Sequence, residues 1–259
     1  MTFRTLSFTF ALAALLLGAA CGGTTDTAKT ETPAGAPAAA VTKVDPATAA
    51  TVAGKVSFAG KAPNRPRIAM DAEPDCKGLH SGPVQSEEVL VNPNGTLANV
   101  VVWVKAGLEG KTFEAPTGSA ALDQKGCIYT PHVVGVRVGQ TISISNSDPT
   151  THNIHPLPRV NREWNQSQPP KGAALEKSFP RPEVVPVKCN VHPWMKSYVA
   201  VMEHPFFAVT GAQGSFELKG LPPGDYTVEA WHEKYPAQEQ KVTLAASATQ
   251  TIDFTFKAE

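Results

Sequence analysis

Short apolar runs with a two-residue period recur from about residue 51 onward, and turn signals separate them. Asn92-Pro-Asn-Gly95 and Leu221-Pro-Pro-Gly-Asp225 are turn signals because glycine and asparagine tolerate a positive φ. No long stretch with the helical period competes with this pattern outside the N-terminus. The spacing therefore predicts an all-β chain built from sandwiches or barrels. The expected strands are 56–58, 89–91, 100–104, 134–138, 142–144, 198–201, 216–218, 226–228, 242–244 and 252–256.

The first 20 residues have the pattern of an export signal. Arg4 supplies one positive charge, an apolar run spans 11–17, and small residues precede Cys21. This run is too short for a membrane-spanning helix, which needs about 20 apolar residues. The stretch before Cys21 resembles a bacterial lipobox, although Gly18 stands where that pattern prefers leucine. The resemblance implies a lipid on Cys21, and the alternative is an ordinary signal peptide cleaved near Ala20.

Residues 21–50 are rich in alanine, threonine, glycine and proline and contain no aromatic residue. Such a segment cannot bury enough apolar surface to offset its ordering entropy. We therefore expect a disordered tether that links the folded part to a lipid. The protein would then face the periplasm or the cell exterior, with membrane contact only through this lipid.

The charge balance argues against nucleic acid as a partner. The chain has 23 Lys and Arg against 23 Asp and Glu, so its formal net charge is zero. A protein that binds the phosphate backbone is usually clearly basic.

The four cysteines are Cys21, Cys76, Cys127 and Cys189. With Cys21 lipidated, three remain, which is an odd number for an exported protein. Cys76 and Cys127 could form a disulfide, leaving Cys189 free. A free thiol in an oxidising compartment invites oxidation unless a metal occupies it.

Two segments carry residues that bind metals. The first, 146–155, contains His152, and the second, 188–196, contains Cys189, His192 and Met195. Two imidazoles and one thiolate with a weak axial thioether are the ligands of a blue-copper site. The cysteine has to be a thiolate, so it cannot take part in a disulfide.

Residues 132–203 resemble the small blue-copper proteins, amicyanin most closely and plastocyanin further off. The matching motifs are Val138-Gly-Gln-Thr141 with Asn146, Thr151-His-Asn-Ile-His155 and Cys189-Asn-Val-His-Pro-Trp-Met195. The resemblance implies a cupredoxin sandwich with one type 1 copper, and it implies that Asn153 ties the two ligand loops together. Gln140 replaces the usual aspartate, and a proline-rich approach at 180–186 also departs from the family. The implied copper ligands are His152, Cys189, His192 and Met195, and the implied electron port is His192, Pro193 and Trp194.

Other interpretations of these residues stay open. A structural zinc would need Cys76 or Cys127 as a further ligand, and a cupredoxin fold without its metal is a third case. We expect His155 at the surface or beside the ligands. The remaining histidines considered, which we expect in packing or surface positions, are His132, His204 and His232.

Residues 207–256 resemble the carboxypeptidase regulatory-like, transthyretin-like sandwich. The motif is a Gly-x-Phe strand at 214–216 followed by the Leu221-Pro-Pro-Gly-x-Tyr226 turn. The family's first strand is missing there, and 51–58 resembles it. We therefore expect a sandwich split between 51–115 and 204–259, with the copper domain, 116–203, inserted. The alternative is two or three domains in series.

These patterns favour an exported, lipid-anchored blue-copper protein that carries single electrons between redox partner proteins. Lys188 and Asn190 flank Cys189, where multicopper oxidases have histidines that reach further coppers, and a complete ligand shell leaves no substrate position. We therefore do not expect an enzyme. The alternatives are a copper-handling lipoprotein and a surface binding module with a cupredoxin fold.

Overall fold

The computed structural model describes residues 40–258. The predicted signal peptide at 1–20, the lipidated Cys21 and most of the predicted tether lie outside the described residues. The described part consists of β-strands and one short helix, α1 (Pro74–Lys77), which confirms the predicted all-β class. No helix among residues 40–258 is long and apolar enough to cross a membrane.

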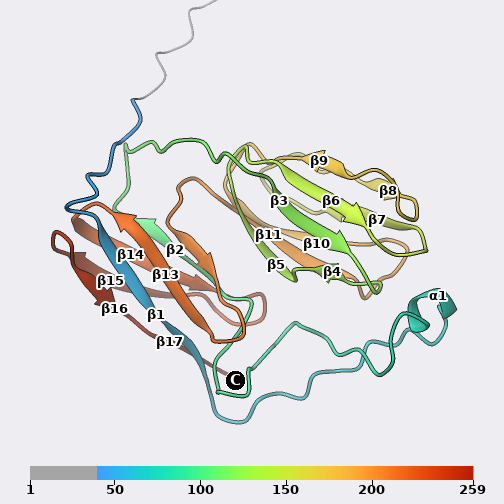
Figure 1. Cartoon of the computed structure of the whole chain (residues 1–259). Coiled ribbons are helices and arrows are strands. Elements are labelled where there is room, and N and C mark those ends of the chain that lie inside the picture. The colour runs from blue at the N-terminus through green and yellow to red at the C-terminus, as the bar shows by residue number, and fades with distance from the viewer. Residues whose placement is uncertain (1–39, 259) are drawn as a thin grey trace, which may run out of the picture. The chain divides into compact units, whose positions relative to one another are not determined.

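The first sandwich pairs the earliest strand with the last ones (Figure 1). In one of its sheets, β1 lies between β13 and β16, and β17 also pairs with β1. In the other sheet the order is β12-β2-β14-β15. Alternate residues of β1 face the core between these sheets, as Val52 and Val56 are fully buried. The strands are β1 (Ala50–Ala59), β2 (Val101–Ala106), β12 (Phe207–Val209), β13 (Ser215–Leu221), β14 (Gly224–Trp231), β15 (Gln238–Leu244), β16 (Thr249–Thr251) and β17 (Phe254–Lys257).

The second sandwich is formed by the strands between β2 and β12. One sheet has the order β5-β11-β10-β7-β8, and the other has β4-β3-β6-β9. Leu122, Ile144, Val185 and Val199 are buried between them. The strands are β3 (Ala120–Gln124), β4 (Tyr129–Thr130), β5 (Val133–Arg137), β6 (Ile142–Asn146), β7 (His152–Pro156), β8 (Gln166–Gln168), β9 (Leu175–Lys177), β10 (Glu183–Lys188) and β11 (Lys196–Met202).

The two sandwiches pack through a third apolar cluster. Val101 of β2 is buried against Val133, Ala200 and Met202 of the second sandwich. At the edge of this contact, the ring of Tyr198 lies 5.2 Å from that of Trp231. A buried pair, His132 with Glu233, adds a polar contact between the sandwiches.

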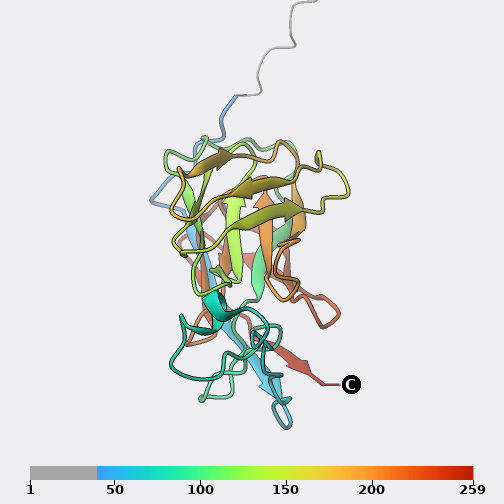
Figure 2. The same ribbon diagram turned by 90° about the vertical axis from the view of Figure 1, so that its right-hand side faces the viewer.

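Between β1 and β2 the chain leaves the first sandwich, carries α1 to the second and returns (Figures 1 and 2). We call residues 61–88 the excursion. Cys76 of α1 forms a disulfide with Cys127, which lies between β3 and β4. The excursion is thus covalently joined to the second sandwich.

Three sequence expectations differ from the structure. Residues 89–91 do not form a strand, because Val91 makes only an isolated bridge to Leu97 across the Asn-Gly turn. The predicted strand 252–256 begins later than expected, since residues 252 and 253 link β16 to β17 and β17 begins at Phe254. The predicted tether runs to residue 50, but Ala50 opens β1 and is 1% exposed, and Val41 bridges Thr112. The predicted domain limits stay a prediction.

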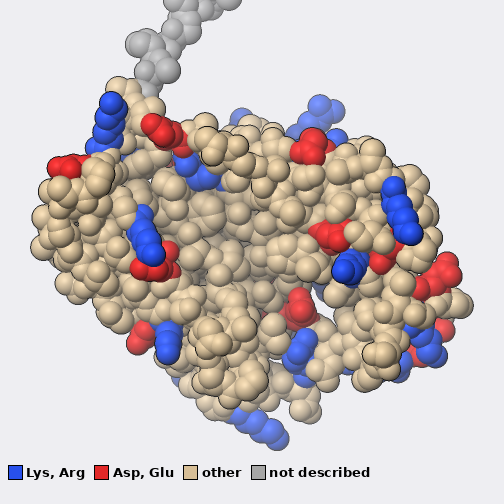
Figure 3. Space-filling model, in the orientation of Figure 1, with Lys and Arg blue, Asp and Glu red and all other residues tan. Residues whose placement is uncertain are grey.

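Basic and acidic side chains are interspersed on the face drawn in Figure 3. This distribution agrees with the formal net charge of zero.

Candidate metal centre

Cys189 and His192 lie on one tight loop that joins two paired strands. Lys188 at the end of β10 pairs with Lys196 at the start of β11. Inside the loop, the Met195 amide donates to the carbonyl of His192 at 3.0 Å, and the Cys189 amide donates to the carbonyl of Met195 at 3.2 Å. These bonds fix the three predicted ligands of this segment within a single turn of the chain.

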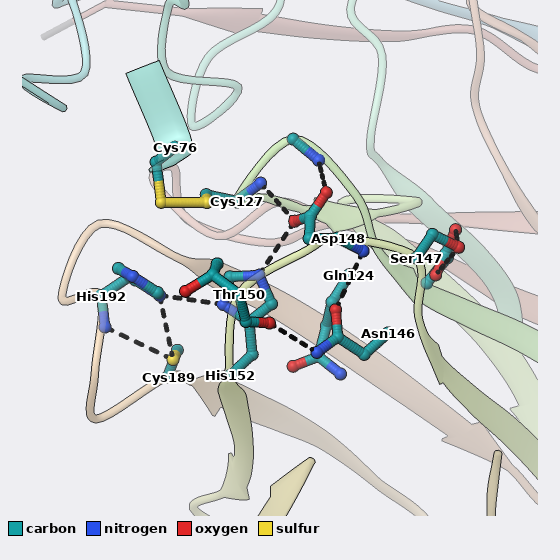
Figure 4. Close-up of polar contacts among 12 residues, drawn as sticks. Cys76, Gln124, Cys127, Asn146, Ser147, Asp148, Thr150, His152, Cys189 and His192 are labelled. Atoms are coloured by element: carbon teal, nitrogen blue, oxygen red, sulfur yellow. Dashed lines mark hydrogen bonds and ion pairs between the residues drawn. A yellow bond between two sulfur atoms is a disulfide. The ribbon is translucent and has the colours of Figure 1, made fainter. Parts of the chain in front are cut away.

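His152 reaches the same place from the start of β7, which pairs with β10. The preceding loop, 147–151, is held by Asn146, whose side-chain amide donates to the carbonyl of Thr150 at 2.9 Å. The structure thereby brings His152, Cys189 and His192 together, with their ligand atoms all within 4.8 Å of one another (Figure 4). All three side chains are buried.

The two imidazoles face each other through the same ring atom. Nδ1 of His152 lies 2.8 Å from Nδ1 of His192, and the Cys189 sulfur lies 3.9 Å from Nδ1 of His192. Met195 is fully buried in the same apolar cluster as Cys189. Two imidazole nitrogens and one sulfur therefore converge, with a thioether on the same loop.

The surroundings of Cys189 favour its thiolate form. Burial alone would raise the pKa of this thiol, but the adjacent His152 ring and the amides of Asn153 and His192 outweigh burial and lower the pKa. In His192, burial followed by the charge of His152 lowers the pKa and favours the neutral ring. A deprotonated sulfur and a neutral imidazole are the forms that bind metals.

Asp148 holds the other side of the His152 ring, a contact that sequence reasoning missed. Its carboxylate lies 2.9 Å from Nε2 of His152 and accepts the amides of Gly126 and Cys127 (Figure 4). Burial opposes ionisation of Asp148, but these bonds prevail and lower its pKa. For His152 burial alone would lower the pKa, and the bonds to Asp148 and Cys189 raise it. The signal available in the sequence was an acidic residue four positions before His152.

Asn153 connects the two ligand segments, as the resemblance implies. Its side-chain oxygen accepts the amide of Asn190, and its carbonyl accepts the hydroxyl of Tyr129 at 2.6 Å. His155 does not join the ligand group; it contacts Glu163 and Asn190 through its two ring nitrogens.

The other histidines considered serve packing and hydrogen bonding. His132 pairs with Glu233, and Nε2 of His204 donates to the carbonyl of Val104 at 2.7 Å. His232 is buried and stacks on Tyr235. Within residues 40–258, none of these three belongs to a group of side chains that could hold a metal.

The predicted electron port is partly enclosed. His192 is only 2% exposed, while Pro193 is exposed and Trp194 is half-buried. The Trp194 ring lies 5.2 Å from the His192 ring. Pro193 and Trp194 line a hollow of about 470 Å³ together with Arg65 and Ile128.

Residues 199–257 match the sequence profile of the carboxypeptidase regulatory-like domain. The chain contains a carboxypeptidase regulatory-like domain. The matched part of this domain begins inside β11 and includes β12 to β17, while β1, which pairs with β13, lies outside the match.

Solved copper proteins resemble part of the chain. A copper-containing nitrite reductase from Thermus scotoductus SA-01 shares 19% identity at a TM-score of 0.32, over 38% of this chain and 25% of its own. A purple cupredoxin from Nitrosopumilus maritimus shares 24% identity at a TM-score of 0.28, over 32% of this chain and 98% of its own. A reduced amicyanin variant shares 22% identity at a TM-score of 0.30, over 39% of this chain and 97% of its own. No curated protein matches the chain. The chain spans a quarter of the nitrite reductase, and at these scores each match is a similarity only.

Proposed function

We propose that the chain is a blue-copper protein that carries single electrons. The observation that carries this proposal is the buried group of His152, Cys189 and His192, with ligand atoms within 4.8 Å of one another. Cys189 is the free cysteine of the described residues, while Cys76 and Cys127 are bonded to each other. This pairing disfavours a structural zinc, which would need one of those two cysteines as a ligand.

The donor set fits copper. Soft thiolate and thioether donors with imidazoles suit this metal, and His152, Cys189, His192 and Met195 would hold it. When bound, copper supplies a one-electron couple. The protein residues fix the positions of the donors, because both ligand segments are tied by the bonds of Asn146 and Asn153. Burial of the ligands keeps water away, and rigid ligands limit rearrangement between the two oxidation states.

An electron carrier is favoured over an enzyme. With four ligands assigned, the centre has no open position for a substrate, and the neighbours of Cys189 are Lys188 and Asn190. We propose that a redox partner protein contacts the exposed part of the ligand loop, where Val191 is 51% exposed and Pro193 is also exposed. Trp194 is half-buried, and its ring lies 5.2 Å from the ring of His192.

Export and a lipid anchor at Cys21 belong to the same proposal. The support is the residue pattern before Cys21 and the Cys76–Cys127 disulfide, because disulfides persist in oxidising compartments.

The test is visible absorption and electron paramagnetic resonance of the full chain reconstituted with Cu(II). We expect an intense thiolate-to-copper band, which Cys189→Ser should abolish. His155→Ala is the matched control and should keep the band, because His155 contacts Glu163 and Asn190 instead of the ligand group. A copper-loaded wild-type protein without this band would refute the proposal.

Electrochemistry separates the carrier from a protein that hands copper on. The carrier keeps its copper through repeated reduction and oxidation. A copper-handling protein would lose Cu(I) to a competing chelator during the same cycles.

A further inference from the structure

The Cys76–Cys127 disulfide lies against both imidazoles of the candidate copper centre. Ligand atoms of Cys76, Cys127 and His192 all lie within 4.8 Å of one another, and so do those of Cys127, Asp148 and His152. Both cysteines are fully buried. The two sulfurs are bonded to each other, so they are not free to bind a metal. Any effect of the disulfide on the centre therefore acts through the backbone that it holds in place.

The backbone of Cys127 fixes Asp148. The amide of Cys127 donates to Asp148 Oδ2 at 2.7 Å, and the amide of Gly126 donates to Oδ1 at 2.6 Å. Asp148 Oδ2 also accepts from Nε2 of His152 at 2.9 Å. The carboxylate is thus held in the 126–127 turn on one side and holds a ligand ring on the other.

The carbonyl of Cys127 fixes the second ligand segment. It accepts the indole Nε1–H of Trp194 at 2.9 Å, and the Trp194 ring lies 5.2 Å from that of His192. One residue therefore connects to both ligand histidines, through Asp148 to His152 and through Trp194 to His192.

The 126–127 turn is itself held by the excursion. Gly126 and Cys127 have φ values of 68° and 52°, in the left-handed region that a non-glycine residue seldom adopts. The disulfide joins Cys127 to Cys76, and Nε2 of His80 donates to the carbonyl of Gly126 at 2.7 Å. Two contacts from the excursion thus constrain this turn.

We propose that the Cys76–Cys127 disulfide positions the two imidazoles of the copper centre, with Asp148 as the positioning residue for His152. The inference rests on the proposed function. A metal-bound histidine whose other ring nitrogen donates to a carboxylate has a fixed tautomer and ring orientation. Because Asp148 takes Nε2–H, the lone pair of His152 Nδ1 points at the centre. A chain without the disulfide keeps all four ligands but loses their preset orientation.

The first test replaces the carboxylate, using Asp148→Asn with Asp123→Asn as the matched control. Asp123 accepts hydroxyls of Ser145 and Ser147 and contacts no imidazole. Asp148→Asn should weaken copper affinity by about 10–100-fold, as substitutions around metal-bound histidines do. In the metal-free protein, ring nitrogen shifts at a pH where the ring is neutral should show the single Nε2–H tautomer of His152 in the wild type and a mixture in Asp148→Asn. Asp123→Asn should match the wild type in both.

The second test replaces the disulfide, using Cys76→Ser with Cys127→Ser in the full chain. Hydrogen exchange of the Gly126 and Cys127 amides should be at least about tenfold faster in the metal-free protein, because these bonds open locally. The same variant should show altered copper hyperfine splitting and a shifted reduction potential. Trp194→Phe keeps a ring beside His192 without the bond to Cys127 and should alter the spectrum without changing the His152 tautomer.

The outcomes separate this inference from the proposed function. If the doubly substituted chain keeps wild-type exchange rates, spectrum and potential, the disulfide only joins the excursion to the sandwich, and the inference is overturned. If the wild type shows no blue-copper spectrum, the proposed function fails. The exchange and tautomer measurements on the metal-free protein still decide whether the disulfide positions the imidazoles.

Discussion

Nδ1 of His152 lies 2.8 Å from Nδ1 of His192 in a buried environment. At this distance the two nitrogens share one hydrogen, so in the metal-free protein each ring is the other's hydrogen-bond partner. A metal that binds both Nδ1 atoms replaces this hydrogen. The contact that stabilises the metal-free site is therefore formed by the atoms that the metal would use.

Replacing one ring should show how much this contact contributes to the free energy of unfolding. His192→Phe removes the 2.8 Å hydrogen bond at Nδ1 of His152, which contributes about 0.5–1.5 kcal/mol. Urea unfolding of the metal-free protein measures the loss, and His155→Phe, at a more exposed histidine on the strand of His152, serves as the control. Equal stability of His192→Phe and the wild type would mean that the 2.8 Å contact contributes nothing.

The axial position should tune the reduction potential of the copper-loaded protein. Met195→Leu keeps an apolar side chain of similar size in a fully buried position but removes the sulfur donor. Cu(I) tolerates the loss of a weak ligand better than Cu(II), so the potential should rise. Met202→Leu, which changes a buried methionine of the interface between the sandwiches, should leave the potential unchanged. Spectroelectrochemistry compares the three proteins.

The close approach of Ile252, between β16 and β17, to β1 requires glycine at position 54. A Cβ there would lie 1.7 Å from the carbonyl oxygen of Ile252, so the backbone itself would have to move. Gly54→Ala should destabilise the protein by about 1–3 kcal/mol, the range found for overpacked cores. Gly211→Ala in the same sandwich has no neighbour within 4 Å and is the control. Equal melting temperatures for the two variants would show that Ile252 does not pack tightly against Gly54.

Acid should weaken the first sandwich through His232. Burial lowers the pKa of His232 from 6.5 to about 4. Between about pH 6.5 and 4, His232 is protonated in the unfolded chain but neutral in the folded chain. The free energy of unfolding therefore falls as the pH falls through this window. The contribution is on the order of 3 kcal/mol. His232→Phe should remove this part of the pH dependence in urea unfolding, whereas parallel curves for the two proteins would contradict it.

The grouping of His152, Cys189 and His192 could be predicted from the sequence because it depends largely on local spacing. Cys189, His192 and Met195 share one loop, and the sequence around His152 supplied the second segment. The role of Asp148 could not be predicted, because it depends on amides from the 126–127 turn, which is distant in the chain. Pro186 belongs to the proline-rich approach that departs from the blue-copper family, yet it lies opposite Tyr198 in a regular ladder between β10 and β11.

The position of the excursion could not be predicted from the sequence either. Residues 61–88 have no periodic pattern, and the structure places this segment through the disulfide at Cys76, the bond from His80 and the buried Met70. The pairing of Cys76 with Cys127 was one interpretation of an odd cysteine count. That the disulfide lies beside both ligand histidines depends on tertiary structure that no local pattern encodes.

The pairing of β1 has a consequence for biosynthesis. During translation β1 emerges early, whereas its antiparallel neighbour β13 and its parallel neighbours β16 and β17 are made only after the strands of the second sandwich. The strands of the second sandwich, β3 to β11, are contiguous in the chain, so this sandwich can fold while β1 is still unpaired. An unpaired strand is a template for aggregation. The nascent protein therefore carries such a strand until β13, β16 and β17 have been made, and loss of β16 and β17 would leave one edge of β1 without its neighbours.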